Sequence, residues 1–219
     1  MRPYNPPTNP YLDVVFSDAH LLVLDKPSGL LTVPGRDPAH QDSLASRAQA
    51  EYPDALIVHR LDMDTSGLVV MARGKEIHRA LSKLFQDRKV EKSYLARVWG
   101  EPVGEEGEVD LPLICDWPNR PKQKVCFESG KPSRTHWKML DSDGVTSLLE
   151  LIPVTGRSHQ LRVHMQALGH PILGDPFYAH AEALAAAPRL LLHAQALEFE
   201  HPVTGRSMNF LCNPGADWQ

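Results

Sequence analysis

One segment of the sequence places a carboxylate in a turn between two apolar runs. It reads His-Arg-Leu-Asp-Met-Asp-Thr-Ser-Gly from residue 59 to residue 67, and the flanking runs are 55–58 and 68–72. Both runs are expected strands, so Asp62 lies on a loop of the kind that commonly carries functional residues on a rigid scaffold. A carboxylate is ionised at neutral pH and can act as a nucleophile at carbon centres such as a sugar C1′. From this loop alone, an aspartate that caps its own turn is the stronger interpretation.

A second polar segment stands at the start of an expected helix. It reads Gly-Arg-Ser-His-Gln-Leu-Arg from residue 156 to residue 162, and Leu161, Met165 and Leu168 form an apolar stripe. A helix start exposes unpaired N–H groups, which favour an anionic ligand. Arg162 follows Leu161 by one residue, so we expect it to point away from the stripe. An ordinary surface arginine is the alternative.

Tyr94 is a third candidate, near the start of an alternating segment, 91–99, and two residues after Lys92. An aromatic ring in this place can stack on a nucleobase, an interaction of ~1–3 kcal/mol per base. A tyrosine at the edge of a core is the alternative that this segment leaves open.

The sequence shows no recognised pattern for a metal or a nucleotide cofactor. His159 and His164 are five residues apart, so one helical face does not hold both, and Cys115, Cys126 and Cys212 form no Cys-x-x-Cys pair. Neither a Walker-type glycine loop nor Gly-x-Gly-x-x-Gly occurs. We therefore expect no metal, no cofactor and reduced thiols.

Charge is distributed unevenly along the chain. The formal net charge of −4 argues against a nucleic-acid partner, but residues 73–97 hold eight Lys or Arg against three acids. Residues 116–138 hold six against two, with Trp117, Phe127 and Trp137 among them. Local basic stretches can follow a phosphate backbone even in an acidic protein, and solvated faces are the alternative.

Nothing in the sequence indicates export or membrane insertion. No apolar run approaches the roughly 18 residues that a membrane span needs, and the N-terminus lacks an apolar signal core. We expect a cytoplasmic protein.

The remaining patterns predict strands and helices without regular βαβ alternation. Residues 1–12 form an extended arm, and residues 112–134 form a long basic loop or loose hairpin. The expected helices are 75–88, 158–168 and 181–187. The expected strands are 21–24, 55–58, 68–72, 91–99, 148–152, 190–193, 195–200 and 207–211. This arrangement predicts an α+β fold in one domain, 1–219, with a mixed, largely antiparallel central sheet flanked by helices and loops.

Taken in order, these segments resemble the motifs of the RluA-type family of pseudouridine synthases. Segments 170–175 and 192–194 also fit, so the resemblance spans roughly residues 20–212. Four ordered motifs are far rarer by chance than one. The matching motifs are Lys26-Pro-Ser-Gly for the first motif, residues 59–67 for the catalytic motif, Lys92-Ser-Tyr94 for the active-site tyrosine, and residues 156–162 for the third motif.

The resemblance implies an isomerase that detaches the uracil of a uridine in RNA and rejoins it through C5, without a cofactor. Asp62 would be the catalytic nucleophile, Tyr94 would stack on the uracil, and Arg162 would form an ion pair with Asp62. The target base must first flip out of its stack, and Arg60 would reach into the gap. The residues expected to contact RNA are Arg60, Lys26, Thr65, Arg120, Lys122, Lys124, Arg157 and His159.

The run 111–126 resembles the short members of this family, which lack the N-terminal S4-like RNA-binding domain of larger relatives. Only some 25 residues precede the first motif, too few for such a domain, so we expect the catalytic domain itself to bind RNA. The short members imply two substrates: uridine-32 in the tRNA anticodon stem-loop and uridine-746 in a 23S rRNA hairpin. Base flipping costs least in a loop, which suits both RNAs. We expect a monomer.

Two other classes of function remain open. The chain would be a non-catalytic RNA-binding or RNA-folding module on the same fold if Asp62→Asn were silent. It would be a metal-dependent hydrolase if Asp62, Asp64 and the histidines ligated a metal, and a chelator would then abolish its activity.

Overall fold

The computed structural model describes residues 4–215 and 218, which fall into two compact units. Unit 1 contains the chain up to Lys92 and from Ala194 onward, and unit 2 contains Ser93–His193. The chain leaves unit 1 within strand β5 (Glu91–Trp99) and returns to it within strand β11 (Leu192–Glu200). Each unit has its own hydrophobic core.

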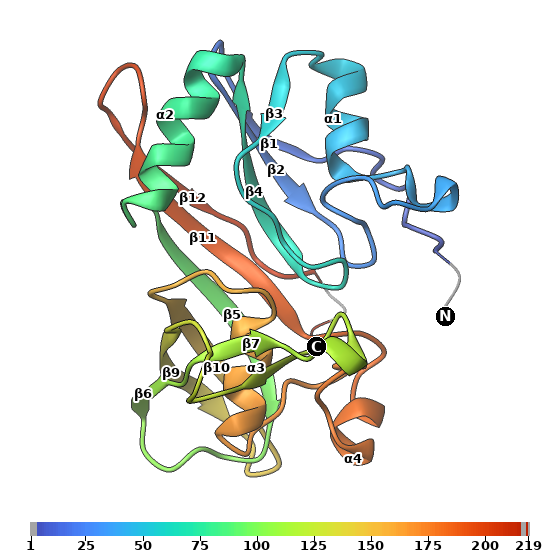
Figure 1. Cartoon of the computed structure of the whole chain (residues 1–219), viewed down its shortest axis with the longest axis vertical. Helices are drawn as coiled ribbons and strands as arrows, with labels where there is room; N and C mark the ends of the chain where they lie inside the picture. The colour runs from blue at the N-terminus through green and yellow to red at the C-terminus, as the bar shows by residue number, and fades with distance from the viewer. Residues whose placement is uncertain (1–3, 216–217, 219) are drawn as a thin grey trace. The chain divides into compact units, whose positions relative to one another are not determined.

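The strands of unit 1 follow the order β1-β2-β4-β11 (Figure 1). β1 (Val14–Ser17), β2 (Leu21–Lys26) and β4 (Ser66–Arg73) pair antiparallel. The short β3 (Ala55–Ile57) also pairs antiparallel with β4, and β12 (Ser207–Leu211) does so with β11.

The register between β2 and β4 determines what lies beside the start of β4. Leu21 pairs with Ala72 at one end of the ladder, and Lys26 pairs with Gly67 at the other. Because the strands are antiparallel, the turn after β2 and the loop before β4 emerge at the same end of the sheet.

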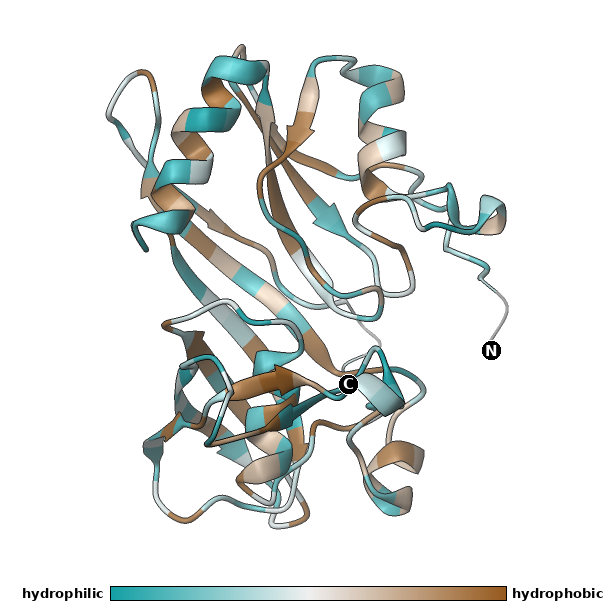
Figure 2. Cartoon of the chain, viewed as in Figure 1, coloured by the Kyte–Doolittle hydropathy of each residue, from teal (hydrophilic) through white to brown (hydrophobic). Residues whose placement is uncertain are grey.

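β2 and β4 are almost continuously buried, which explains why they are apolar runs rather than alternating strands. Helix α2 (Lys75–Gln86) contributes Ile77 and Leu81 to the same core. Its opposite side exposes basic residues, among them Lys83. Figure 2 shows this amphipathic pattern as teal and brown bands along α2, against mostly brown strands.

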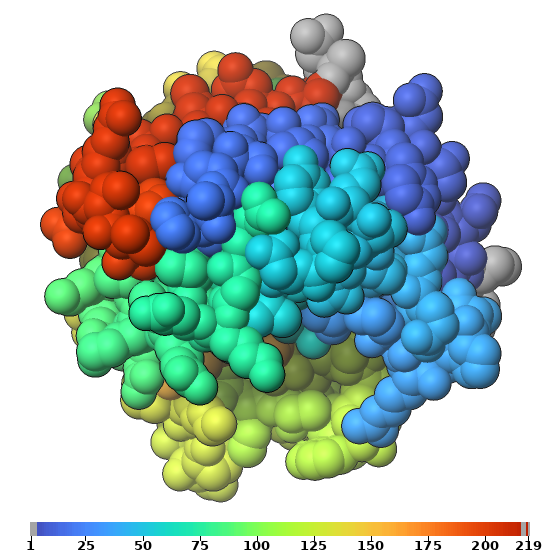
Figure 3. Space-filling view, turned by 90° about the horizontal axis from the view of Figure 1, so that it is seen from above, coloured from blue at the N-terminus to red at the C-terminus, as the bar shows by residue number. Residues whose placement is uncertain are grey.

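Helix α1 (Leu44–Glu51) begins at a capping box in which Ser43 and Ser46 bond each other's backbone N–H. The short helix η1 (Pro38–His40) precedes it. Arg47 of α1 is fully buried and donates from Nε and Nη2 to the carboxylate of Asp42, both at 2.7 Å. Figure 3 shows α1 and α2 at the surface of unit 1, viewed from above.

Unit 2 contains a four-strand antiparallel arrangement in the order β5-β10-β9-β6. Its other strands, β7 and β8, form a separate antiparallel hairpin. The elements are β6 (Glu106–Asp110), β7 (Leu113–Cys115), η2 (Trp117–Asn119), β8 (Gln123–Val125), β9 (Arg134–Ser142), β10 (Thr146–Pro153), α3 (Gln160–Ala167) and α4 (Ala181–Ala185).

The core of unit 2 joins α3 to the sheet. Leu161 and Met165 of α3 pack with Trp137 of β9 and with Leu149 and Leu151 of β10. None of the helices in the described residues is both long and apolar enough to cross a membrane.

The predicted α+β class, with a mixed, largely antiparallel sheet flanked by few helices, is confirmed. The basic segment 112–134 is a loose hairpin, as one of its two interpretations held. In the predicted arm, residues 4–12 contain no helix or strand, and residues 1–3 lie outside the described residues. The extent of the domain as 1–219 stays a prediction.

Among the strands and α-helices of the described residues, β1, α1, β6 and β9 were missed, as was the short helix η1. The apolar stripe of α1 is short because the buried Arg47 takes part of it, and Asp42 compensates its charge. β6 buries only Val109 and exposes acids beside it, so its segment looks like a solvated charge run. In β9, Thr135 and Trp137 point inward between exposed polar residues.

Several boundaries differ from those expected, and two of the differences bear on the site. The strands expected at 190–193 and 195–200 are one strand, β11, which continues through Ala194 and begins only at Leu192. Helix α3 begins at Gln160 rather than Ser158, because His159 adopts a left-handed conformation with φ of 54°.

Candidate active site

The loop that carries Asp62 connects β3 to β4 in unit 1, and we call residues 58–65 the Asp62 loop. Asp62 is half-buried and Arg60 is exposed, whereas Thr65 is buried. The N–H of Thr65 donates to the carbonyl of Asp62 at 3.2 Å, which closes the turn that the sequence indicates. The turn places Asp62 and Arg60 at accessible positions of an otherwise anchored loop.

Residues 26–32, which we call the strap, begin with the last residue of β2 and hold the backbone of the Asp62 loop. Ser28 Oγ donates to the carbonyl of Asp64 at 2.7 Å. The N–H of Gly29 donates to the carbonyl of Met63 at 2.9 Å. Both bonds lie on the C-terminal side of Asp62.

Thr32 fixes the N-terminal side of the same loop. Its hydroxyl donates to the carbonyl of Leu61 at 2.7 Å and accepts the N–H of Leu61 at 3.2 Å. A hydroxyl can do both because it has one donor and two acceptor sites. The backbone is therefore held on each side of Asp62.

Lys26 joins the strap to the Asp62 loop through a fully buried ammonium group. Its Nζ donates to the carbonyls of Pro27, Leu30 and Met63 at 2.9, 2.8 and 2.9 Å. A buried ammonium needs such partners because desolvation of an unpaired charge is costly. This burial does not favour the direct RNA contact predicted for Lys26 and indicates a positioning role for it. Thr65, also buried, is likewise placed within the protein rather than at its surface.

The N-terminal arm supports the strap. Tyr4 Oη accepts the N–H of Leu31 at 3.0 Å and donates to the carbonyl of Asp42 at 2.7 Å. Arg47 Nη1 donates to the carbonyl of Pro7 at 2.8 Å. The arm is thus bound both to the strap and to the start of α1.

His59 is the second residue of the Asp62 loop and is held as a neutral imidazole. Its Nε2 accepts the N–H of Val70 at 3.0 Å, and its ring stacks on Phe85 with centroids 4.6 Å apart. Burial, and secondarily the charge of Lys92, lower the pKa of His59 to about 3. The sequence reasoning gave His59 no role of its own, although it stands in the catalytic motif.

Gly67 allows close packing at the point where the loop enters β4. Its φ is 111°, and a Cβ there would overlap the backbone of Ala194 in β11. Only glycine suits both conditions. The glycine of the motif therefore has a structural reason in unit 1.

Arg162 is buried in unit 2 and forms a two-point ion pair with Asp175. Nε donates to Oδ2 at 2.8 Å and Nη2 donates to Oδ1 at 2.7 Å. Both side chains are at most 2% exposed. The guanidinium also lies 5.1 Å from the ring centroid of Phe177 and 5.2 Å from that of Tyr178. Such a pair fixes the direction of the planar guanidinium.

The surroundings of Arg162 correct one interpretation and leave another untested. A surface arginine is wrong, because the buried carboxylate of Asp175 compensates the charge inside the protein. The ion pair with Asp62 stays a prediction, because Asp62 belongs to unit 1 and Arg162 to unit 2.

Tyr178 connects the Arg162 region to the hairpin β7–β8. Its Oη accepts the N–H of Gln123 at 2.8 Å and lies 2.6 Å from Nδ1 of His159. Tyr178 packs with Leu113 of β7 and Val163 of α3 in a small core. The base of the hairpin is therefore fixed to α3.

The predicted stacking residue, Tyr94, lies in β5 of unit 2. It is half-buried, packs against the core of unit 2 and pairs with Leu151 of β10. One side of the side chain thus rests on a rigid sheet. That position suits a stacking role without establishing it.

The basic hairpin, which we define as residues 111–131, carries three of the predicted RNA contacts. Arg120 and Lys124 are exposed and Lys122 is half-buried. Lys124 lies 3.5 Å from the carboxylate of Asp116. Arg157, before α3, is also exposed.

The predicted residues therefore divide between the units. Lys26, Arg60, Asp62 and Thr65 lie in unit 1. Unit 2 holds Tyr94, Arg120, Lys122, Lys124, Arg157, His159 and Arg162. Sequence reasoning missed Asp175 and Tyr178, although segment 170–175 had been noted for its resemblance to the family.

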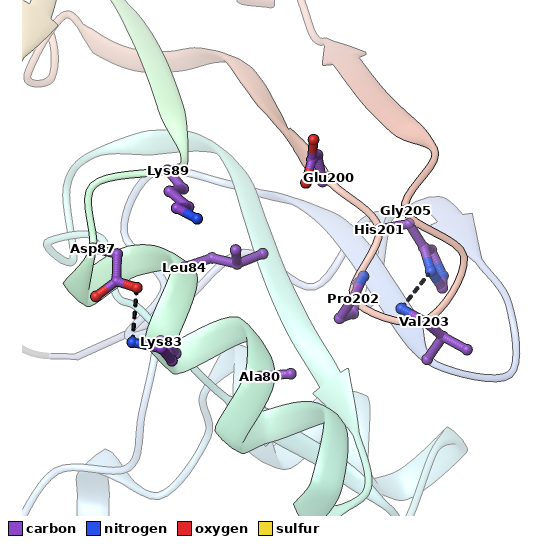
Figure 4. A pocket seen from close by; sticks show the side chains of 10 residues that line it. All are labelled: Ala80, Lys83, Leu84, Asp87, Lys89, Glu200, His201, Pro202, Val203 and Gly205. Atoms are coloured by element: carbon purple, nitrogen blue, oxygen red, sulfur yellow. Dashed lines mark hydrogen bonds and ion pairs between the residues drawn. The ribbon is translucent and has the colours of Figure 1, made fainter.

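A separate hollow of about 430 Å³ lies in unit 1 between the end of α2 and the loop after β11 (Figure 4). Lys83, Lys89 and Val203 are among its lining residues, and the Lys83 ammonium pairs with Asp87 at 2.9 Å. The described residues around it include none of the predicted site residues. Within residues 4–215 and 218, no group of three His, Cys, Asp or Glu is arranged to hold a metal ion.

Comparison with known proteins identifies the class to which this arrangement belongs. Residues 20–167 match the family described as RNA pseudouridylate synthase. A protein of Vibrio parahaemolyticus named "Dual-specificity RNA pseudouridine synthase RluA" is 60% identical over 207 residues, 92% of this chain and 83% of that protein. The protein of the same name from Escherichia coli strain K12 is 57% identical over 211 residues, 96% of each chain.

Solved structures agree with the sequence comparison. Human RNA Pseudouridylate Synthase Domain Containing 1 has a TM-score of 0.79 and 27% identity, over 96% of this chain and 86% of that one. Human RNA Pseudouridylate Synthase Domain Containing 4 has a TM-score of 0.76 and 26% identity, over 93% and 89%.

The fold and the matched motifs define an RNA-modifying isomerase, which converts uridine to pseudouridine within an RNA chain. The chain belongs to the RNA pseudouridylate synthase family. The predicted resemblance to that family is confirmed.

Proposed function

We propose that this enzyme isomerises uridines in two RNAs, the tRNA anticodon stem-loop and a 23S rRNA hairpin. The observation that carries the proposal is the 60% identity over 207 residues to a relative named for dual specificity. The hairpin run 111–126 supports it, because this run resembles the short members of the family rather than the larger ones.

The reaction follows from a flipped uridine and a fixed carboxylate. The target base leaves its stack, at a cost of a few kcal/mol that is least in a loop. Asp62 then assists cleavage of the bond between N1 and C1′, either by attack on the ribose or on the base. The uracil rotates, C5 bonds to C1′, the bond formed by Asp62 breaks and returns its electron pair to the carboxylate, the C5 proton leaves, and N1 takes up a proton. Atoms and electrons balance without an oxidant or a cofactor.

The other residues have supporting roles in this proposal. Tyr94 stacks on the uracil while it is detached, and Arg162 directs its guanidinium toward the carboxylate of Asp62. Arg60, exposed two residues before Asp62, fills the gap that the flipped base leaves. Exposed basic side chains of the protein's basic hairpin, such as Arg120 and Lys124, neutralise phosphates of the RNA.

The test measures tritium released from C5 of uridine in each of the two hairpins. We expect release from both RNAs with the unaltered enzyme, and an isosteric Asp62→Asn variant that binds RNA but releases none. Release from one hairpin alone would overturn dual specificity. Equal release by Asp62→Asn would remove Asp62 as nucleophile, and loss of release in EDTA would favour a metal-dependent reaction.

We further propose that the enzyme acts as a monomer in the cytoplasm, where both RNAs occur. Light scattering at the concentrations used in the assay measures the first point, and a particle of twice the chain mass would contradict it. Fractionation of cells expressing the chain measures the second.

A further inference from the structure

Trp117 is a large apolar side chain at the tip of the basic hairpin, and it is 65% exposed. It is the first residue of the short helix η2, between β7 and β8. The guanidinium carbon of Arg120 lies 4.2 Å from the centroid of the ring. An exposed tryptophan beside a cation offers a ligand both an aromatic face and a positive charge.

The tip that carries Trp117 is internally ordered. Asn119 Nδ2 donates to the carboxylate of Asp116 at 2.8 Å. The N–H of Asp116 donates to the carbonyl of Lys122 at 2.9 Å, and the N–H of Lys122 donates to the carbonyl of Asn119 at 3.0 Å. These bonds close the tip across its two ends. The ring is therefore presented by a formed turn, which lowers the entropy cost of binding.

The base of the same hairpin is also fixed. The N–H of Gln123 donates to Tyr178 Oη at 2.8 Å, and Leu113 and Val125 pack on the small core of α3. The hairpin that carries Trp117 thus packs on α3, the helix that contains Arg162.

The charge around Trp117 identifies the kind of ligand. Arg120, Lys122 and Lys124 lie within seven residues of Trp117, and residues 116–138 hold six Lys or Arg against two acidic residues. A flat aromatic face beside cations suits a flat, uncharged ring joined to an anionic backbone. A nucleobase of RNA has these properties, and base–aromatic stacking tolerates any base because each has a π-face.

We propose that Trp117 and Arg120 form a stacking site for an unpaired nucleobase of the substrate RNA, distinct from the target uridine. Tyr94 is the stacking partner already proposed for the target uracil, and it lies on β5 rather than on the hairpin. The site takes a second base, from the loop or its flank, and so positions the RNA around the flipped nucleotide. The inference rests on the proposed function only for the identity of the two hairpins.

The test combines protein variants with abasic substitutions in the RNA. Each unpaired nucleotide except the target is replaced in turn by an abasic spacer, and dissociation constants are measured for the unaltered chain and for Trp117→Ala. We expect Trp117→Ala to weaken binding about 5- to 150-fold, which corresponds to ~1–3 kcal/mol. At one position the spacer should weaken binding to the unaltered chain but have no further effect on the variant. The loss should appear in KM rather than in kcat.

Further variants separate stacking from other contributions. Trp117→Phe keeps an aromatic face and should restore most of the affinity, whereas Trp117→Leu keeps apolar bulk and should not. Leu140→Ala, which shortens another exposed apolar side chain of unit 2, should leave the affinity unchanged. Tryptophan fluorescence should be quenched by RNA in the unaltered chain and much less in Trp117→Phe.

The outcomes are distinguishable from a failure of the proposed function. Suppose that tritium is released from the hairpins while every abasic spacer changes the dissociation constants of the unaltered chain and of Trp117→Ala by the same factor. The stacking site is then wrong and the proposed function stands. If Trp117→Leu binds as tightly as the unaltered chain, apolar packing replaces stacking and the proposal is also wrong. If the effects of one spacer and of Trp117→Ala on the dissociation constant are not additive, but one of the hairpins releases no tritium, dual specificity fails while the stacking site stands.

Discussion

Asp62 and Arg162 are positioned in different ways. The Asp62 loop is held by several single hydrogen bonds from the strap to its backbone carbonyls and to one N–H. Arg162 forms a two-point ion pair, in which Asp175 supplies two acceptor oxygens. The first arrangement spreads the positioning over several residues, and the second concentrates two charge-assisted bonds in one carboxylate.

The two sites should therefore respond differently when a substitution removes one of these bonds. Loss of one strap bond leaves the other bonds in place, so the Asp62 loop should loosen gradually. Loss of the Asp175 charge removes a buried counter-charge that accepts two bonds from the guanidinium, which is costly in a desolvated place. Asp175 also accepts the N–H groups of Phe177 and Tyr178, so its loss should disturb the segment beneath the hairpin as well.

The largest effect is therefore expected from Asp175→Asn. The variant keeps the shape of the side chain but removes the charge, so we expect a loss of about 3–5 kcal/mol in the free energy of unfolding. Activity per folded molecule should fall because the guanidinium is no longer directed. Urea unfolding measures the first and tritium release the second. Asp141→Asn, at an exposed position of β9, is the control, and equal stability of the two variants would contradict the concentrated arrangement.

Lys26→Met should have the next largest effect. It retains the apolar stem but removes the donor shared by three carbonyls, at a cost of about 2–4 kcal/mol. The fall should appear in kcat more than in KM, because the Asp62 loop loses its position while the exposed RNA-binding residues remain. Lys75→Met, at an exposed position of α2, is the matched control. A large rise in KM with unchanged kcat would instead support the RNA contact first predicted for Lys26.

The imidazole at the start of the Asp62 loop predicts a pH dependence of stability. The pKa of His59 is about 3 in the folded chain, against an ordinary value of 6.5. Above pH 6.5 both states are neutral and the group has no effect. Between pH 6.5 and 3 the unfolded chain takes up a proton that the folded chain does not, so stability falls with acidification by up to about 1.4 kcal/mol per pH unit.

His59→Gln isolates this contribution, because a glutamine amide oxygen can still accept the N–H of Val70. Unfolding free energies measured from pH 7 to pH 4.5 should fall less steeply in the variant. His164, whose pKa is also lowered by burial, titrates in the same direction but is present in both proteins. Parallel curves would show that His59 is not held neutral.

Local periodicity was sufficient to predict some elements and not others. Helix α2 was predicted from its single apolar face, which includes Ile77 and Leu81. This face packs on the sheet, and its buried residues are both apolar, so the periodicity is complete. Helix α1 was missed because the buried Arg47 occupies a position where the pattern requires an apolar residue. Its partner Asp42 lies before the helix, so the compensation is not visible as periodicity.

The same limit applies to the site. Asp62, Tyr94 and Arg162 were found by ordered motifs, and the catalytic roles of all three remain predictions. Helical spacing placed Arg162 away from the apolar stripe and left a surface arginine as the alternative, because its partner Asp175 is thirteen residues away and belongs to another segment. Lys26 was predicted to contact RNA because its partners within the protein cannot be identified from the sequence. They are three backbone carbonyls that only the fold brings together.

Ser28→Ala should have the smallest effect and sharpens the comparison most directly. It removes one bond of the strap, to the carbonyl of Asp64, and leaves those from Gly29 and Thr32. We expect a loss of about 0.5–1.5 kcal/mol in stability and a fall of a few-fold in kcat. Ser207→Ala, at an exposed position of β12, should change neither. A combined Ser28→Ala, Thr32→Val variant tests whether the strap acts as a set. Losses that add would indicate independent bonds, whereas a double loss much greater than the sum would show that each bond substitutes for the other, because the loop would then stay in place until both are gone.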